Sequence, residues 1–146
     1  MDQPPALLPQ DLEPTASGFL EGAPPKRLAY HRWEHPNPVG RVVIVHGYGE
    51  HGRRYCHVAH WLHERGWSVS ALDQEGFGAS SGTRGDARGI RPFVEDLVTF
   101  LHHERHHDVQ RVQAPPRMVD GVPMPPLPTG PQVVLGHSFG GLVALL

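Results

Sequence analysis

A serine in a glycine-flanked pentapeptide is the residue of this sequence best suited to nucleophilic chemistry. Ser138 lies in Gly136-His137-Ser138-Phe139-Gly140, which fits the pattern Gly-x-Ser-x-Gly. An apolar run at 133–135 precedes the pentapeptide, and a second apolar run at 142–146 follows it. A sharp turn between a strand and a helix holds a serine strained and exposed, and the flanking glycines allow the chains to approach closely. The sequence therefore predicts that Ser138 is a nucleophile, with a helix N-terminus behind it that favours developing negative charge.

The same pattern occurs a second time, at Gly78-Ala79-Ser80-Ser81-Gly82. This match lies in a glycine-rich loop, and no helical pattern follows it directly. We therefore interpret Ser80 as structural. Asp73 begins the loop and offers a carboxylate that could be catalytic. We favour a structural role, in which Asp73 and Ser80 hydrogen-bond the loop and brace the neighbouring turn.

A glycine-rich turn also follows the β-branched run 41–46. Its residues His46-Gly47-Tyr48-Gly49 can present the backbone N–H of Tyr48 toward Ser138. With the N–H of Phe139 as a second donor, this arrangement predicts an oxyanion hole, in which each donor contributes roughly 2.7–4 kcal/mol of transition-state stabilisation. We expect His46 to orient the loop and the His137 side chain to point away from the serine. The alternative is an ordinary strand-to-helix turn without chemistry.

A third pattern resembles a metal site. His103-Glu104-Arg105-His106-His107 matches His-Glu-x-x-His, the zinc protease motif. A catalytic zinc site also needs a third ligand and a cleft, and the sequence indicates neither. The helical periodicity places His103 and His107 away from the apolar stripe, so we interpret this segment as a solvated helix face and expect no metal and no cofactor. Cys56 is interpreted as a packing residue.

The elements that must position these groups follow from hydrophobic periodicity. Residues 1–25 contain six prolines and are predicted to be a disordered tail. Strands are expected at 28–33, 41–46, 67–72 and 132–135, and helices at 54–65, 91–107 and 140–146. The proline-rich stretch 111–131 is predicted to be an irregular insertion. Alternating strands and helices predict an α/β fold, with a doubly wound, mainly parallel sheet and helices on both faces.

Composition excludes several classes of protein. The chain has 146 residues, of which 38% are hydrophobic and 19% charged, which is typical of a globular domain. A net charge of −2 gives no electrostatic case for nucleic-acid binding. No apolar run reaches the roughly 18 residues of a membrane-spanning helix, and no signal peptide is visible. The single cysteine excludes an internal disulfide and fits a reducing compartment, so we expect a cytoplasmic protein.

Taken in order, these motifs resemble the N-terminal part of an α/β-hydrolase. Within that fold, residues 26–146 are similar to the monoacylglycerol lipase and lysophospholipase group of the serine aminopeptidase-like hydrolases. The motifs that carry the resemblance are His46-Gly47-Tyr48-Gly49-Glu50-His51 with Arg54-Tyr55, Asp73 with Gly76-Phe77-Gly78-Ala79-Ser80 and Gly82, Phe93-Val94-Glu95-Asp96, and Gly136-His137-Ser138-Phe139-Gly140-Gly141. The resemblance implies a serine hydrolase of acyl esters with a lipid-like small-molecule substrate, Ser138 as nucleophile, and Tyr48 and Phe139 as oxyanion donors.

The sequence departs from the family pattern after the serine. The family places its catalytic acid and histidine well downstream of the nucleophile, and only eight residues follow Ser138 here. We therefore expect an incomplete α/β-hydrolase fold with little or no turnover. One alternative is a non-catalytic fragment or pseudo-hydrolase that acts by binding, including edge-to-edge self-association through the unfinished sheet. Another is a different activity of the same fold, such as a thioesterase or peptidase.

Overall fold

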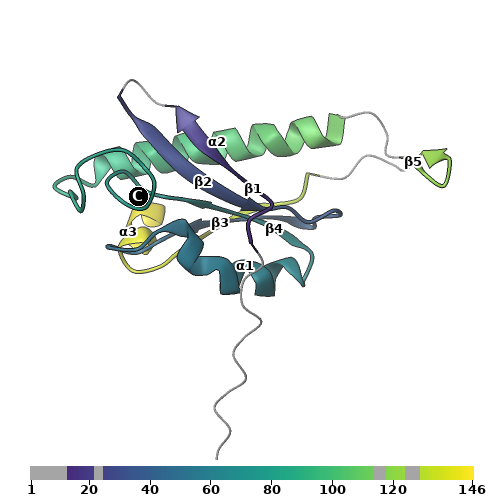
Figure 1. The fold of residues 1–146 in the computed structure, drawn as a ribbon, viewed down its shortest axis with the longest axis horizontal. Coiled ribbons are helices and arrows are strands. Elements are labelled where there is room, and N and C mark those ends of the chain that lie inside the picture. Colours follow the sequence, from purple (N-terminus) through teal and green to yellow (C-terminus); the bar gives the residue numbers. More distant parts are fainter. Residues whose placement is uncertain (1–12, 22–24, 114–117, 124–128) are drawn as a thin grey trace, which may run out of the picture.

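The computed structural model describes residues 13–21, 25–113, 118–123 and 129–146. Its centre is a five-stranded sheet with the strand order β1-β2-β4-β3-β7 (Figure 1). The strands of this sheet are β1 Ala16–Glu21, β2 Arg27–Trp33, β4 Trp67–Leu72, β3 Gly40–Val45 and β7 Gln132–Gly136. The helices are η1 Gly52–Tyr55, a short 3₁₀ helix, and α1 Cys56–His63, α2 Arg91–Gln113 and α3 Phe139–Leu145.

The central strands confirm the predicted α/β class. β3 pairs in parallel with β4 on one side and with β7 on the other. β2 runs antiparallel to β4, and β1 runs antiparallel to β2, so the sheet is mixed but mostly parallel in direction. The antiparallel β2 is compatible with the predicted, mainly parallel sheet, because a strand that precedes the first crossover unit can pair in either direction.

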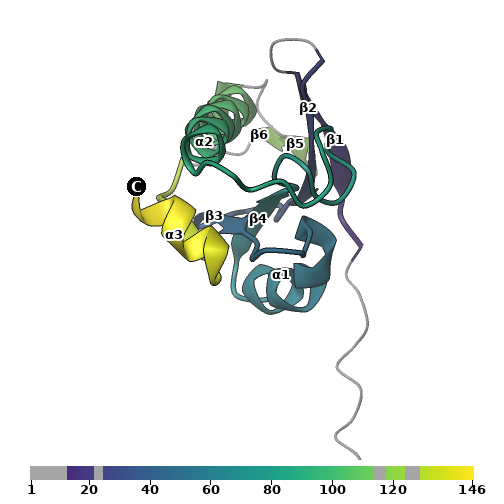
Figure 2. The same ribbon diagram turned by 90° about the vertical axis from the view of Figure 1, so that its left-hand side faces the viewer.

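The β-branched sequence of β3 explains its position in the middle of three layers. All six residues of β3 are buried, and alternate side chains enter opposite layers. Val42 and Ile44 pack with Ala59 of α1 on one face. Val43 and Val45 pack on the other face against a core that includes Phe93, Leu97 and Phe100 of α2 and Val143 of α3. Figure 2 shows α1 separated from α2 and α3 by the sheet.

The prediction of a disordered tail over residues 1–25 is wrong for Ala16–Glu21. These residues form β1, which pairs with β2 from Ala16 opposite Arg32 to Glu21 opposite Arg27. Phe19 and Leu20 are adjacent and do not alternate clearly with polar residues, so local pattern does not mark a strand. Long-range pairing and the packing of Leu20 against the core select it instead. Residues 1–12 and 22–24 of the predicted tail lie outside the described residues.

The prediction of an irregular insertion at 111–131 is also wrong in part. Helix α2 extends to Gln113 rather than ending at 107. Strands β5 Met118–Val119 and β6 Val122–Pro123 form a small hairpin. Its two turn residues, Asp120 and Gly121, have φ angles of +50° and +78°, which suit the Asp-Gly turn that favours tight hairpins. Residues 114–117 and 124–128 of this stretch lie outside the described residues.

Within the part of the chain that the structure describes, none of the helices combines the length and the hydrophobicity needed to cross a bilayer.

Candidate active site

Ser138 occupies a strained turn between the end of β7 and the start of α3. Its φ of +54° and ψ of −118° lie close to the first central position of a type II′ turn, which normally holds glycine. The N–H of Gly140 donates to the carbonyl of His137 at 2.9 Å and closes this turn. The residue is exposed to solvent. A non-glycine residue with these angles costs about 1–3 kcal/mol and is characteristic of functional sites.

Two glycines make this turn possible. A Cβ at residue 136 would lie 2.6 Å from the Cα of Gly141, and a Cβ at residue 140 would overlap the carbonyl oxygens of Val45 and His46. Both contacts involve backbone, which cannot rotate away as a side chain can. The flanking glycines of the motif are therefore required by the close approach of α3 to β7 and to the end of β3.

The turn that contains Tyr48 lies beside the serine turn. Val45 and Gly136 are partners at the carboxyl ends of β3 and β7, and the N–H of His137 donates to the Val45 carbonyl at 3.1 Å. The rings of Tyr48 and Phe139 lie 6.5 Å apart, edge to face. The parallel pairing thus brings Tyr48, Ser138 and Phe139 to the same edge of the sheet. Parallel sheets place their ligand sites at this edge.

His46 is a buried structural group at the end of β3, with 1% of its surface exposed. The Gln74 N–H donates to its Nε2 at 2.9 Å, and its Nδ1 lies 2.8 Å from the Gly47 carbonyl. Because Nε2 accepts a backbone proton, Nδ1 carries the ring proton and donates it to Gly47. Burial lowers the pKa of His46, which favours this neutral form. His46 therefore holds the start of the Tyr48 turn, and both of its nitrogens are engaged.

Asp73 and Ser80 brace the loop, as the structural interpretation predicts. The carboxylate of Asp73 accepts from the N–H of Gly52 at 2.7 Å and from the N–H of Ala79 at 3.0 Å. The Ser80 hydroxyl donates to the Asp73 carbonyl and accepts from the N–H of Ala29. Both side chains are buried. Ser80 is therefore a buried link between β2 and the loop, not a second exposed nucleophile.

Sequence reasoning did not assign a role to Glu50 or Tyr55, which the structure places beside the serine turn. The Glu50 carboxylate and the Tyr55 hydroxyl both lie within hydrogen-bonding distance of the His137 ring. Gly49-Glu50-His51 and Tyr55 belong to the motifs that carry the family resemblance. The sequence does not indicate which residues they contact. The side chain of His137 contacts these two polar residues, Glu50 and Tyr55.

The interpretation of His103–His107 as a solvated helix face is wrong for His103, Glu104 and His107, whereas Arg105 and His106 are exposed. Glu104 is fully buried, and His103 and His107 are only partly exposed. The Glu104 carboxylate accepts hydrogen bonds from Nε and Nη2 of Arg32, and His107 pairs with Glu34. The helical wheel misses this because the partners, Arg32 of β2 and Glu34 just after it, lie about seventy residues away in sequence. Among the described residues, no group of three or more histidine, cysteine or acidic side chains is placed to hold a metal.

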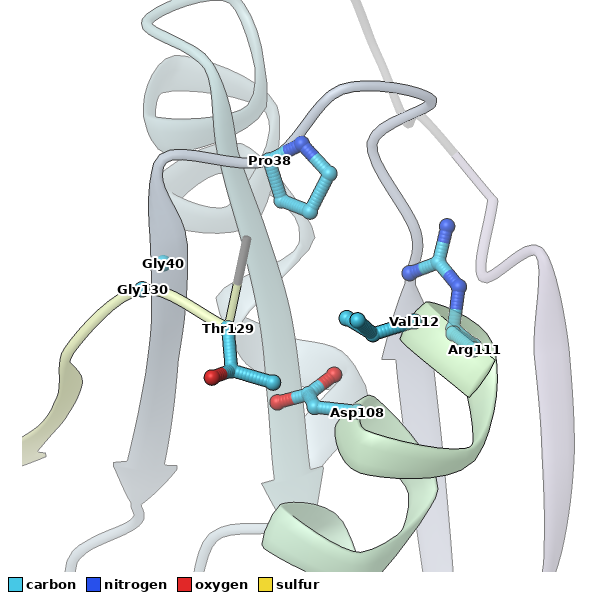
Figure 3. Close-up of a pocket in the computed structure, with 7 residues that line it drawn as sticks. All are labelled: Pro38, Gly40, Asp108, Arg111, Val112, Thr129 and Gly130. Carbon is cyan, nitrogen blue, oxygen red and sulfur yellow. The ribbon is translucent and has the colours of Figure 1, made fainter. Parts of the chain in front are cut away.

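Two hollows in the surface differ in their relation to Ser138. A cavity of about 20 Å³ is lined by Gly40, Asp108, Arg111 and Gly130 among others, and Figure 3 shows these residues. It lies at the amino end of β3, which is the opposite end of the sheet from Ser138. A larger, open hollow of about 490 Å³ lies along the loop after β4, lined by Thr83, Asp86, Arg88 and Phe93 among others. Only this one is near the serine turn, because the rings of Phe93 and Phe139 lie 5.2 Å apart.

The sheet order, the helices on both faces and the serine turn at the end of β7 define an α/β-hydrolase fold. The structure superposes on a soluble variant of monoglyceride lipase from Saccharomyces cerevisiae, solved with a substrate analog. The TM-score is 0.68 with 22% sequence identity, and the match covers 96% of this chain and 41% of that one.

The chain also matches a known sequence family. The model of the family "Serine aminopeptidase, S33" matches residues 36–146, and the chain belongs to this family. The chain is 38% identical over 116 residues to a monoacylglycerol lipase of Mycolicibacterium smegmatis, covering 79% of this chain and 35% of the relative. It is 31% identical over 109 residues to the human monoglyceride lipase, covering 75% and 30%. The chain thus spans about a third of the length of these curated relatives.

Proposed function

We propose that this chain supplies the nucleophile and the oxyanion donors of a serine hydrolase that acts on lipid-like acyl esters. The observation that carries the proposal is the backbone of Ser138, whose φ of +54° is maintained in an exposed turn between a strand and a helix. Such strain persists only when the surrounding structure imposes it. The similarity to monoacylglycerol lipases supports an ester of glycerol or a lysophospholipid as the substrate.

In the proposed reaction, the Ser138 hydroxyl attacks the ester carbonyl and forms a tetrahedral intermediate. The backbone N–H groups of Tyr48 and Phe139 stabilise the negative oxygen of this intermediate. Collapse of the intermediate expels the alcohol and leaves an acyl group on Ser138, and water then releases the carboxylic acid. The N-terminus of α3 adds a favourable potential at the same place.

We assign no general base among the described residues. None of the side-chain hydrogen bonds in the described part of the chain involves the Ser138 hydroxyl, and both nitrogens of His46 are engaged elsewhere. The family order places the acid and the histidine after the serine. Because loss of the histidine from a triad lowers the rate by roughly a million-fold, a covalent probe tests the nucleophile more directly than turnover does.

Covalent labelling tests the nucleophile without requiring turnover. The chain is incubated with a fluorophosphonate probe, and the modified residue is located by mass spectrometry. We expect the label on Ser138 and its loss in Ser138→Ala. Ser17→Ala is the matched control, because Ser17 is an exposed serine whose hydroxyl lies 2.9 Å from a nitrogen of His31. A label spread equally over surface serines, or one lost in Ser17→Ala, would overturn the proposal.

Acyl transfer tests the substrate class. A glycerol monoester, a lysophospholipid, an acyl thioester and a peptide anilide are supplied separately, and the acylated form of Ser138 is measured by mass spectrometry. We expect the glycerol ester or the lysophospholipid to acylate Ser138 fastest. Faster acylation by the thioester or the anilide would assign the chain to a thioesterase or a peptidase instead.

An exposed apolar strand favours a second candidate, a protein that acts by binding. Val133, Val134 and Leu135 of β7 are 36–43% exposed, and Leu142 of α3 is 50% exposed. Sheet edges of this kind pair with other chains. Sedimentation equilibrium distinguishes this candidate: concentration-dependent dimers that Val134→Lys abolishes would support self-association. A monomer over the whole concentration range would exclude it.

A further inference from the structure

The two turns that carry the proposed oxyanion donors are each closed by a backbone hydrogen bond. The N–H of Glu50 donates to the Gly47 carbonyl at 3.2 Å and closes the turn that contains Tyr48. Gly49 occupies its second central position with a φ of +74°, as a type II turn requires. The N–H of Gly140 closes the turn that contains Ser138 and Phe139. The two turns are nearly ninety residues apart in sequence. The pairing of β3 with β7 brings them together, and a side-chain contact between them would fix their relative position further.

One carboxylate oxygen of Glu50 contacts residues of both turns. Its Oε2 accepts from the N–H of Gly47 at 2.9 Å and from the Tyr55 hydroxyl at 2.7 Å, and it lies 3.3 Å from Nδ1 of His137. The Tyr55 oxygen is itself 3.1 Å from the same nitrogen. Because an ionised carboxylate only accepts hydrogen bonds, His137 is the donor in its contact with Glu50. Glu50 therefore bonds to its own turn, to the helical segment after it and to the residue that precedes Ser138.

The surroundings of Glu50 favour its charged form. The hydrogen bond from Tyr55 is the largest cause that lowers the pKa of Glu50 to about 2, and burial together with the Glu50 carboxylate raises the pKa of Tyr55 to about 12. Hydrogen bonds to an ionised acceptor are roughly twice as strong as neutral ones. A Cβ at residue 47 would lie 2.9 Å from the Glu50 oxygen and 3.3 Å from the His137 carbonyl. Glycine at 47 thus allows this close approach.

The contact between Glu50 and His137 is largely exposed, and exposed contacts of this kind contribute little to stability. The effect of Glu50 must therefore be sought in geometry. Oxyanion donors act only when they lie at hydrogen-bonding distance from the developing charge. A misplacement of about 1 Å can lower a reaction rate by roughly a hundred-fold. One donor belongs to the turn of Glu50 and the other to the turn of His137.

We infer that Glu50 is a positioning residue that fixes the Tyr48 turn against the serine turn through His137, so that the two N–H donors face one point. This inference rests on the proposed oxyanion roles of Tyr48 and Phe139. It adds a residue that does not touch the reacting atoms but determines the spacing of the groups that do.

Hydrogen exchange tests the coupling between the turns and does not depend on the reactivity of Ser138. Amide exchange at residues 50 and 140 is measured by NMR in the native chain and in Glu50→Ala. We expect exchange at Gly140 to become at least tenfold faster, although Gly140 lies in the other turn. Glu64→Ala is the matched control, because Glu64 is an exposed carboxylate whose partner is His60. Unchanged exchange at Gly140 in Glu50→Ala would overturn the inference.

A kinetic measurement separates this inference from the proposed function. Fluorophosphonate labelling of Ser138 should be at least tenfold slower in Glu50→Ala and unchanged in Glu64→Ala. If native Ser138 is labelled and Glu50→Ala is labelled equally fast, the inference fails while the proposed function stands. If native Ser138 is not labelled, the proposed function fails and the exchange experiment still decides whether the turns are coupled.

A conservative variant guards against loss of folding. Glu50→Gln keeps an oxygen that can accept from Gly47 or Tyr55 but removes the negative charge. We expect it to remain folded by circular dichroism and to show exchange and labelling rates between those of the native chain and Glu50→Ala. Rates in Glu50→Gln identical to those of the native chain would show that the charge has no part in positioning.

Discussion

Gly140 lies so close to Val45 that a Cβ at position 140 would overlap the Val45 carbonyl oxygen. The contact joins the start of α3 to the end of β3, and both partners are backbone. We therefore predict that Gly140→Ala lowers the free energy of unfolding by about 1–3 kcal/mol or more, because the backbone must shift to accommodate a methyl group. Urea denaturation followed by circular dichroism measures the effect.

The neighbouring glycine provides the control for this prediction. A Cβ at residue 141 would meet its nearest atom at 3.5 Å, which is an ordinary contact. Gly141→Ala should therefore leave stability unchanged or raise it by up to about 1 kcal/mol, because alanine favours helix more than glycine does. Equal losses of stability in the two variants would show that the close approach of α3 to β3 is not the cause.

The strained backbone of Ser138 leads to a second prediction. Glycine adopts its φ and ψ without steric cost, so Ser138→Gly should raise the free energy of unfolding by about 1 kcal/mol, after the entropy cost of glycine is subtracted from the strain. Ser138→Ala retains the strain and should change stability by less than about 0.5 kcal/mol. Thermal denaturation of the three proteins tests this order. A lower melting temperature for Ser138→Gly than for Ser138→Ala would contradict it.

A third prediction concerns the buried ion pairs between α2 and the sheet. Glu104 accepts from Arg32 Nε at 2.9 Å and from Arg32 Nη2 at 2.6 Å, and Arg41 lies 3.4 Å away. Burial alone would raise the pKa of Glu104, but the bonds from Arg32 and the charge of Arg41 outweigh burial and lower it. Glu104→Gln should lower the free energy of unfolding by about 3–5 kcal/mol, because buried Arg32 loses the carboxylate that it pairs with, whereas Arg41 keeps Glu34 and Asp108.

Glu95→Gln is the control for Glu104→Gln. Glu95 lies on the same helix and pairs with Arg91 at 2.8 Å, but both side chains are exposed. The same substitution there should change stability by less than about 1 kcal/mol. Similar urea midpoints for Glu104→Gln and the native chain would show that the buried ion pairs have little effect on stability.

A fourth prediction follows from the buried, neutral His46. Its pKa lies below 6.5 in the folded chain, so at lower pH the unfolded chain binds the proton more readily. The stability that neutral His46 contributes is complete above pH 6.5 and is lost as the pH falls below that value, with a slope of at most about 1.4 kcal/mol per pH unit. Urea denaturation between pH 7.5 and 5.5 measures the slope, which should be smaller in His46→Gln. A slope in His46→Gln equal to the native slope would contradict this prediction.

The sequence predicted the central strands and the serine turn because each has a strong local signal. The β-branched residues of 41–46 require burial on both faces, and Gly136 and Gly140 mark the turn around Ser138. β1 was missed because Ala16–Glu21 is an edge strand that depends on its partner β2. The role of Glu104 was missed because its partners Arg32 and Arg41 are more than sixty residues away in sequence. Glu50 was recognised as part of a motif, but its contact with His137 requires the parallel pairing of β3 and β7.

The position of β7 in the sheet has a consequence for the dynamics of Ser138. In the described part of the chain, β7 has β3 as its one neighbouring strand, whereas β3 is flanked on both sides. Breaking the ladder between β3 and β7 would release Ser138 and α3 together, while the other four strands keep their pairing. Proteins open in such contiguous units at free energies below that of complete unfolding. We therefore expect the lifetime of the Ser138 turn to be set by this local opening rather than by denaturation of the whole domain.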